Sequence, residues 1–367
     1  MKVISVVHTS FVNDNRVARI ARAMGEFSDD ITVLAWRKGK LPKQDNQENF
    51  KVERISVRSE LIPRWNLVFG AIHFVEYIFR AAWRARKADL IICNDIEGFC
   101  IGLLAKFFKK RIKLIYDCHE LESERMGKSK WNKKFVNAVE RKYINRSSFA
   151  ITVSPSIKEW YEMKYPYLNV ILVRNIPYVQ KVSKGNLFHD KFELDYSMRV
   201  FLYQGALMEG RGLELLIDAF ENYVKDQRNV LVIMGSGKLQ NEIERKAKLS
   251  NRIFFHEAVS MDELPNYTGS AYFGINSVEP KCLSYAYCLP NKFFETLLSG
   301  IPILTNDLVD CANLVEQYKV GKVFKKWTAE GIAEVVEEVS HEGIDCYKLG
   351  LQNFRNEISW DKEQENL

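Results

Sequence analysis

The chain has 367 residues, enough for two domains of about 150–200 residues, and its hydrophobic content of 47% and charged content of 27% are those of a soluble globular protein. Seven scattered cysteines without a CxxC pair argue against a disulfide framework or a zinc site and favour the cytoplasm. Residues 1–175 carry 32 Lys and Arg against 19 Asp and Glu, whereas residues 176–367 carry 21 against 28, so the first half is expected to meet an anionic partner: nucleic acid, a phospholipid surface or a phosphorylated substrate.

The first half alternates short apolar strands with helical patterns. It opens with MKVISVVHTSF, which lacks the features of a signal peptide and is expected to be a buried strand. Residues 13–27 have the periodicity of an amphipathic helix, with Asn13 or Asp14 as its N-terminal cap and Arg16 as either a surface charge or an anion contact. Five further apolar runs end in polar residues and are expected to be strands: 30–36, 88–95, 112–120, 149–156 and 170–177.

The polar residues that follow these strands should gather at one sheet edge, because βαβ units bring the carboxyl ends of parallel strands together and ligands bind there. The strand at 112–120 ends in Asp117, His119 and Glu120. His119 either contacts a ligand or only stabilises its loop. The spacing of Asp117 and Glu120 does not indicate a paired-carboxylate hydrolase.

A segment rich in aromatic residues, 64–87, interrupts this alternation. His73 and Glu76 break its apolar run, which falls short of the ~20 residues that a membrane-spanning helix needs. It is either a helix packed on the first sheet or a surface helix resting on anionic lipid, with the basic stretch 105–113 extending that surface. The residues that would face lipid in the second case are Trp65, Arg80, Trp83, Arg84, Arg86 and Lys87.

The strand–helix pattern restarts after the polar stretch 175–190. Helices are expected at 213–224 and 238–249, and strands at 199–207, 229–237, 252–259, 271–277 and 300–306. The fold class predicted from both halves is α/β, with two Rossmann-like doubly wound domains facing a central cleft.

Two glycine-rich turns follow strands of the second half. In YQGALMEGRGLELL, glycines at 205, 210 and 212 would let the backbone approach a ligand, and Arg211 could clamp a diphosphate. The second turn, MGSGKL with Gly237, is either another phosphate contact or a simple tight turn. The sequence has no P-loop and no GxGxxG turn after the first strand, which disfavours P-loop ATPases and nicotinamide dehydrogenases. It also has no DxD or other metal-binding cluster and no GxSxG elbow, which disfavours metal-dependent enzymes and serine hydrolases.

The stretch LPNKFFETLLSG, residues 289–300, predicts a short amphipathic helix with Asn291 as its cap. Lys292 and Glu295 fall on its polar face. They are either a surface ion pair contributing ~0.2–0.5 kcal/mol or ligand contacts, and periodicity alone leaves both open.

Several stretches resemble glycosyltransferase family 4, a family of retaining GT-B glycosyltransferases, and in particular bacterial members that build surface polysaccharides. In the second half the resemblance lies in YQGALMEGRGLELLIDAF, LVIMGSGKLQNEIERKAK, FFHEAVSMDELPNY and LPNKFFETLLSGIPILTND. In the first half it lies in NDNRVARIARAM, YDCHELE, VERKYINRSSFAITVSPSIKEWYEMKY and VILVRNIP, and at the end in ISWDKEQENL. The domains this implies are an acceptor-side domain at 1–175, a linker at 176–198, a nucleotide-sugar domain at 199–345 and a C-terminal helix at 346–367 that crosses back to the first domain.

The resemblance also implies roles for individual residues. Glu295 corresponds to the glutamate that binds the ribose hydroxyls, and Arg211 to the basic residue on the donor diphosphate, beside Gly205. Two positions depart from the family: Ala206 replaces a basic residue, for which Lys292 is the candidate substitute, and Tyr287 replaces a glutamate. The remaining implied contacts are Gly237 and Asn291 with the donor, His119 with the donor sugar, and Asn13, Asp14, Arg16, Asp117 and Glu120 around the acceptor or reaction centre.

The function implied is transfer of a sugar from a UDP- or GDP-linked donor to a glycan or lipid-pyrophosphate-linked acceptor, with retention and without a metal ion or other cofactor. The basic first half would then lie on the anionic inner face of the plasma membrane rather than on nucleic acid. A nucleotide-sugar 2-epimerase-like enzyme is the alternative among enzymes. A catalytically inactive GT-B-like protein that binds or regulates a partner is the alternative of another class.

Overall fold

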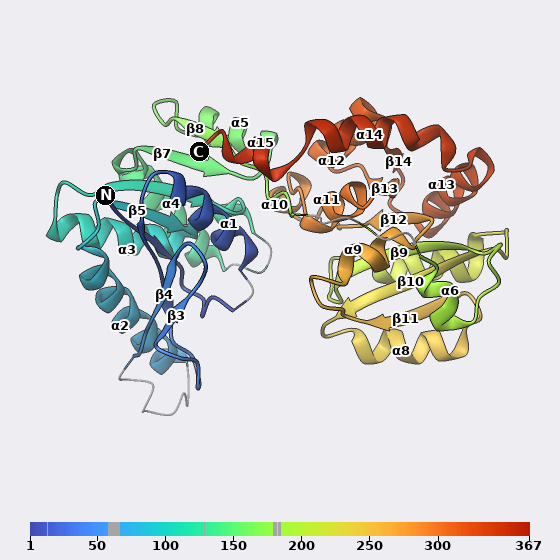
Figure 1. The fold of residues 1–367 in the computed structure, drawn as a ribbon, viewed down its shortest axis with the longest axis horizontal. Helices are drawn as coiled ribbons and strands as arrows, with labels where there is room; N and C mark the ends of the chain where they lie inside the picture. Colours follow the sequence, from blue (N-terminus) through green and yellow to red (C-terminus); the bar gives the residue numbers. More distant parts are fainter. Residues whose placement is uncertain (13, 58–66, 126, 128, 179–181, 183–184) are drawn as a thin grey trace. The chain divides into compact units, whose positions relative to one another are not determined.

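The computed structural model describes residues 1–12, 14–57, 67–125, 127, 129–178, 182 and 185–367. The chain divides into two compact units, Met1–Arg174 with Gln364–Leu367, and Asn175–Glu363. Each unit has its own β-sheet with helices packed on it (Figure 1). Both sheets are built from parallel strands joined by helices, which confirms the predicted fold class of two Rossmann-like α/β domains.

The sheet of the first unit has the strand order β3-β4-β2-β1-β5-β6-β7-β8, parallel except for the outer pair β3 and β4. Its strands are β1 (Lys2–Val6), β2 (Asp30–Trp36), β3 (Gln44–Asn46), β4 (Lys51–Ile55), β5 (Leu90–Asn94), β6 (Lys113–Cys118), β7 (Phe149–Thr152) and β8 (Val170–Leu172). The chain leaves β1 toward β2 and later returns to β5 on its other side, so the strand order reverses between β1 and β5. Ligands of open α/β sheets bind at such a reversal.

The helices of the first unit are α1 (Asn15–Ala23), α2 (Leu67–Ala85), α3 (Asp95–Phe108), α4 (Lys130–Tyr143) and α5 (Pro155–Lys164). Short 3₁₀ turns cover Met24–Glu26, Glu122–Glu124 and Ile144–Arg146. Helix α1 begins after Asp14, whose carboxylate accepts a hydrogen bond from the backbone N–H of Val17 at 3.2 Å. The sequence predicted Asn13 or Asp14 as the cap of this helix, and Asp14 is the cap that the structure shows.

The sheet of the second unit is parallel throughout, with the order β11-β10-β9-β12-β13-β14. Its strands are β9 (Arg199–Ala206), β10 (Asn229–Ser236), β11 (Ile253–Glu257), β12 (Phe273–Asn276), β13 (Ile303–Asn306) and β14 (Gly321–Phe324). Its order reverses between β9 and β12. The helices are α6 (Leu187–Phe192), α7 (Leu213–Asp218) with a π-helical turn Ala219–Tyr223, α8 (Gln240–Leu249), α9 (Leu264–Gly269), α10 (Leu283–Ala286), α11 (Asn291–Leu298), α12 (Val309–Tyr318), α13 (Ala329–Glu342), α14 (Lys348–Glu357), preceded by a 3₁₀ turn at Asp345–Tyr347, and α15 (Trp360–Gln364).

Both faces of the second sheet are buried, which is why its strands read as continuous apolar runs. Side chains alternate along β9: Phe201 and Tyr203 join one core with Phe293 of α11, whereas Leu202 joins another with Phe188 of α6. Helix α6 belongs to residues 176–198, the range expected to be a linker, and it packs on one face of the sheet.

Three strands were not expected from the sequence: β3, β4 and β14. The helical part of the aromatic segment 64–87 begins at Leu67, and Trp65 lies outside the described residues. No helix among the described residues combines the length and the apolar character that crossing a membrane requires.

Two glycine-bearing turns at the ends of β9 and β10 lie against each other in the second unit. The backbone N–H of Leu207 donates to the carbonyl of Ser236 at 2.9 Å, and the N–H of Leu239 donates to the carbonyl of Leu207 at 3.0 Å. A Cβ at Gly235, whose φ is +154°, would lie 1.9 Å from the carbonyl oxygen of Gly205. No side chain can be accommodated there without moving the backbone of β9.

We therefore expect Gly235→Ala to lower the free energy of unfolding by roughly 2–3 kcal/mol, because the new methyl group must push two strands apart. The measurement is urea unfolding followed by circular dichroism. Gly25→Ala is the matched control, since a Cβ at Gly25 meets no atom within 4 Å. Equal stability of the two variants would contradict the strand packing described above.

Candidate functional site

In the second unit, predicted site residues gather where the strand order reverses, at the carboxyl ends of β9 and β12. Gly205 lies near the end of β9 with a φ of +128°, a conformation that favours glycine. Ser277 follows β12 directly, and Lys292 reaches this edge from the first turn of α11. Helix α11 begins at Asn291 itself, so the prediction of Asn291 as its cap is wrong: Pro290 occupies the cap position and leaves the Asn291 side chain exposed.

Lys292 is buried, with 9% of its surface exposed. Its Nζ lies 4.0 Å from the centroid of the Tyr203 ring and 3.5 Å from the carbonyl oxygen of Ser277. Burial, and secondly repulsion from Arg211, lower the pKa of Lys292 to about 7. Both effects disfavour the charged ammonium, so an anion bound at this edge would stabilise it.

The carboxylate of Glu295 is oriented by a short chain of hydrogen bonds. Thr268 Oγ1 donates to Gln204 Oε1 at 2.7 Å, and Gln204 Nε2 donates to Glu295 Oε2 at 2.9 Å. Since Lys292 is buried and Glu295 is held by Gln204, the interpretation of this pair as a solvated surface ion pair is wrong. Sequence reasoning missed Gln204 because its partners lie far along the chain.

Arg211 lies in the turn between β9 and α7. It stands between Gly210 (φ +79°) and Gly212 (φ +66°), and its backbone carbonyl accepts a hydrogen bond from Ser277 Oγ at 2.7 Å. Its guanidinium carbon lies 5.4 Å from the centroid of the Tyr285 ring. The turn is thus fixed to the end of β12, on the edge where Lys292 lies, and the two cations are close enough to repel each other.

Gly237 belongs to the neighbouring turn after β10. A Cβ there would lie 2.3 Å from the carbonyl oxygen of Leu207, so packing between the two turns by itself requires a glycine at this position.

In the first unit, the polar ends of β5 and β6 form a second cluster. Arg16 of α1 is 4% exposed, and its guanidinium donates to both carboxylate oxygens of Asp117, the shortest contact being Nη2 to Oδ1 at 2.6 Å. His119 Nε2 lies 3.1 Å from Asp117 Oδ2, and its Nδ1 lies 3.5 Å from Asp95 Oδ2. Of the two alternatives for Arg16, the surface charge is wrong, because its guanidinium is buried against the Asp117 carboxylate and the carbonyl of Val173.

The charges in this cluster alternate along the chain of contacts. Burial disfavours the charged form of His119, but the carboxylates of Asp95 and Asp117 outweigh it and raise the pKa of His119 to about 9. Burial likewise opposes ionisation of Asp117, yet Arg16 and His119 hold the pKa of that carboxyl well below its usual range. Burial raises the pKa of Asp95 to about 6, with His119 acting in the opposite direction. His119 is therefore a cation at neutral pH.

Asp95 was not singled out from the sequence, although it ends the predicted strand 88–95. It is the first residue of α3 and one of the few non-glycine residues with a positive φ, at +56°. Such a conformation costs of order 1–3 kcal/mol and is often found at functional positions.

The other predicted residues of the first unit lie at the margins of this cluster. The Asp14 carboxylate caps α1, and Glu120 is half-exposed with Oε2 2.9 Å from Nε of Arg125. Asn13 lies outside the described residues. Within the described residues no group of three or more His, Cys, Asp and Glu side chains could hold a metal ion. The predicted site residues thus form two clusters, one in each unit.

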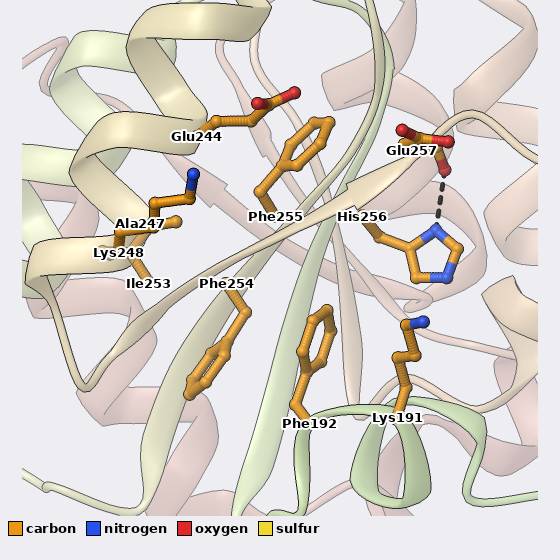
Figure 2. Close-up of a pocket in the computed structure, with 10 residues that line it drawn as sticks. All are labelled: Lys191, Phe192, Glu244, Ala247, Lys248, Ile253, Phe254, Phe255, His256 and Glu257. Atoms are coloured by element: carbon orange, nitrogen blue, oxygen red, sulfur yellow. Dashed lines mark hydrogen bonds between the residues drawn. The ribbon is translucent and has the colours of Figure 1, made fainter.

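A cavity of about 500 Å³ lies along the outer strand β11, between α6 and α8. Figure 2 shows its aromatic side chains, Phe192, Phe254 and Phe255, with His256, whose Nδ1 is 2.7 Å from the carbonyl oxygen of Glu257. None of the predicted site residues lines this cavity.

Solved structures share this fold. Sucrose-phosphate synthase from Thermosynechococcus elongatus has a TM-score of 0.79 and 13% identity, and the match covers 100% of this chain and 97% of that one. Anabaena Alr3699/HepE in complex with UDP and glucose has a TM-score of 0.76 and 14% identity, with coverage of 100% and 97%. The two Rossmann-like units with clusters at their strand reversals therefore define a protein of the GT-B fold.

Sequence comparison adds the family. Residues 14–175 match the glycosyl transferase 4-like domain, and residues 198–342 match the glycosyl transferases group 1 domain. The chain belongs to the glycosyltransferases of the GT-B type, which confirms the resemblance at that level. A glycogen synthase from Mycoplasma mobile (strain ATCC 43663 / 163K / NCTC 11711) is 25% identical over 327 residues, and the chain covers 63% of that protein, less than two thirds of its length. The match takes in 82% of this chain.

The charge of His119 can be measured directly. We expect NMR titration to give His119 a pKa well above the usual histidine range, and Asp95→Asn to lower it by at least about one unit, because the substitution removes a negative charge but keeps an acceptor for the backbone N–H of His119. His119→Gln assigns the resonance. A pKa that is the same in the parent and in Asp95→Asn would contradict this electrostatic description.

Proposed function

We propose that the chain transfers a sugar from a nucleotide-sugar donor, UDP- or GDP-linked, to a glycan or lipid-linked glycan acceptor, with retention of configuration, in cell-surface polysaccharide synthesis. The observation that carries the proposal is the set of side chains at the β9–β12 edge. Lys292 and Arg211 are two cations that repel each other. Glu295 lies about one helical turn after Lys292 on α11, and its carboxylate is oriented by the hydrogen bond from Gln204. A nucleoside diphosphate complements all three, with phosphates for the cations and ribose hydroxyls for the carboxylate. The complexes of Anabaena Alr3699/HepE with UDP and glucose, a protein of the same fold, support this choice of ligand.

Each residue of the second unit has a role in this proposal. Gly205 lets the phosphates approach the end of β9, and Glu295 accepts hydrogen bonds from the ribose. Gln204 fixes the direction of that carboxylate. As the glycosidic bond breaks, negative charge grows on the leaving diphosphate, and Lys292 and Arg211 stabilise it. Lys292 supplies the second positive charge that the family places at the position of Ala206.

In the first unit, His119 has a different role from that of a general base. A histidine with a pKa of about 9 is already protonated at neutral pH, and both of its ring nitrogens face carboxylates, so it supplies a fixed positive charge rather than accepting a proton. We assign it to the donor sugar, with Asp95 and Asp117 fixing its ring. The acceptor hydroxyl attacks the face that the diphosphate leaves, and its proton passes to the departing phosphate oxygen. No protein nucleophile and no metal ion is required for this step.

The acceptor is assigned to the first unit. Its excess of basic residues suits a lipid-pyrophosphate-linked glycan at the anionic inner face of the plasma membrane, with the protein on the cytoplasmic side. A thermal-shift screen with UDP, GDP and ADP tests the donor part of the proposal: one of the nucleotides should raise the melting temperature. No shift with any of them would remove the basis for an enzyme of this kind.

Glu295→Ala should weaken binding of the stabilising nucleotide at least tenfold while lowering the melting temperature of the unliganded protein by only a few degrees, the cost of removing the acceptor of Gln204 Nε2. Isothermal titration calorimetry measures both variants. Glu214→Ala, at an exposed glutamate of α7, is the control and should bind as the parent does. Unchanged affinity in Glu295→Ala would rule out the ribose role.

Lys292 should make nucleotide affinity depend on pH. Its pKa is about 7 without ligand, and a bound diphosphate must raise it, so binding takes up a proton between the two values. Affinity for UDP is then highest below pH 7 and falls as the pH rises through that range, by at most about tenfold per unit. In Lys292→Met the affinity should be lower and nearly independent of pH from 7 to 9, with Arg211 still charged. A parent protein whose affinity is constant over this range would contradict the role of Lys292.

A further inference from the structure

Helix α2 of the first unit is apolar on both of its sides. One side is fully buried, with Tyr77, Ala81 and Ala85 at 0% exposure. The opposite side carries Ile72, Val75, Phe79 and Trp83, which are 48–58% exposed. A helix at a protein surface ordinarily shows polar side chains to water, whereas the outer side of α2 shows apolar ones, with its charged residues Glu76, Arg80 and Arg84 elsewhere on the helix. The outer side of α2 therefore has the composition of a contact surface.

The last turn of α3 extends this surface. Helices α2 and α3 lie side by side (Figure 1), and Phe107 and Phe108 at the end of α3 are 79% and 44% exposed. The rings of Trp83 and Phe108 meet edge to face with centroids 5.7 Å apart, and those of Phe107 and Phe108 with centroids 5.9 Å apart. The α2–α3 patch is defined as these six side chains: Ile72, Val75, Phe79, Trp83, Phe107 and Phe108.

Basic side chains border the α2–α3 patch. The guanidinium of Arg86 lies over the Trp83 ring, with its carbon 3.7 Å from the centroid, and Lys87, Lys110 and Arg111 are exposed at the same end of the two helices. A pocket of about 590 Å³ opens beside Phe79, Trp83 and Phe108. Its polar lining is mainly basic, from Lys43, Arg54, Arg80 and Arg84, with one acidic residue, Glu53.

The arginines of α2 are not equally available to a ligand. Arg80 Nε lies 2.6 Å from Glu76 Oε1, and Arg84 Nε lies 2.6 Å from Glu53 Oε1. These pairs neutralise part of the local charge, so we assign the main attraction for an anionic surface to Arg86, Lys87, Lys110 and Arg111. Reversing Arg80 or Arg84 would break an ion pair of the fold, which makes Lys110 and Arg111 the cleaner positions to test.

We propose that the α2–α3 patch docks on a bilayer that contains anionic phospholipid. The aromatic rings would lie at the boundary between headgroups and acyl chains, where amphipathic and aromatic side chains are most stable, and the basic border would face lipid phosphates at ~1 kcal/mol per residue. An apolar patch bordered by positive charge complements this surface in both respects. The inference deepens the proposed function, on which it rests for its purpose, by naming the surface that would bring the first unit to a lipid-linked acceptor.

The experiment is co-sedimentation of the full chain with vesicles of phosphatidylcholine mixed with phosphatidylglycerol, compared with phosphatidylcholine alone. The parent should sediment with the anionic vesicles and much less with the neutral ones. Phe79→Ser/Trp83→Ser and Lys110→Glu/Arg111→Glu should each weaken vesicle affinity at least tenfold. Arg245→Glu/Leu249→Ser, which changes an exposed basic and an exposed apolar residue on α8, is the matched control and should sediment as the parent does. Melting temperatures verify that every variant is folded.

Three results would overturn the inference: a parent that stays in the supernatant with anionic vesicles, patch variants that sediment normally, or loss of sedimentation in Trp131→Ser/Phe135→Ser alone, which would move docking to the exposed aromatic pair of α4. Failure of the inference is separable from failure of the proposed function. Glu295→Ala should sediment normally while losing nucleotide, whereas the α2–α3 patch variants should bind UDP as the parent does.

Discussion

A lysine ammonium buried at the carboxyl end of a sheet is the constraint around which the second unit is built. Lys292 gains the Tyr203 ring face, a long contact to the Ser277 carbonyl and a weak attraction from Glu295, while Arg211 opposes its charge from the neighbouring turn. Burying a charge with so little compensation is costly unless a partner arrives. Gly205 leaves the backbone at the end of β9 open, since a Cβ there would meet no atom closer than 3.9 Å, and α11 presents both Lys292 and Glu295 to this edge. The open backbone and the poorly compensated positive charge therefore both favour binding of an anion at this edge.

In the first unit the buried charges compensate one another. There Arg16, Asp117, His119 and Asp95 alternate in sign, and each buried charge has an opposite neighbour. This cluster needs no ligand to be balanced, and its effect is to keep His119 protonated and its ring fixed. In the proposed function, the excess of positive charge in one unit serves the leaving group, and the fixed cationic ring of His119 in the other serves the donor sugar. The division suits a reaction in which a diphosphate departs and no side chain attacks.

Much of the fold was predictable because parallel strands covered on both faces leave long apolar runs, as in β9 and β10, and because Asp14 before Val17 and Ile20 is an ordinary helix start. The edge strand β3 and its neighbour β4 were missed because both are short and partly exposed, without such a run. Periodicity placed Lys292 on a polar face but could not show that this face lies against the end of β9. Gln204, Asp95 and the burial of Arg16 depend on contacts between residues far apart in the chain, which no local pattern encodes.

The measurement that tests the central claim most directly is a crystal structure of the chain with UDP. We expect the diphosphate within hydrogen-bonding distance of Lys292 Nζ and the Arg211 guanidinium, and the ribose hydroxyls on the Glu295 carboxylate, with the Gln204 hydrogen bond kept. Nucleotide bound elsewhere, for example in the cavity along β11, with Lys292 and Glu295 untouched, would contradict it.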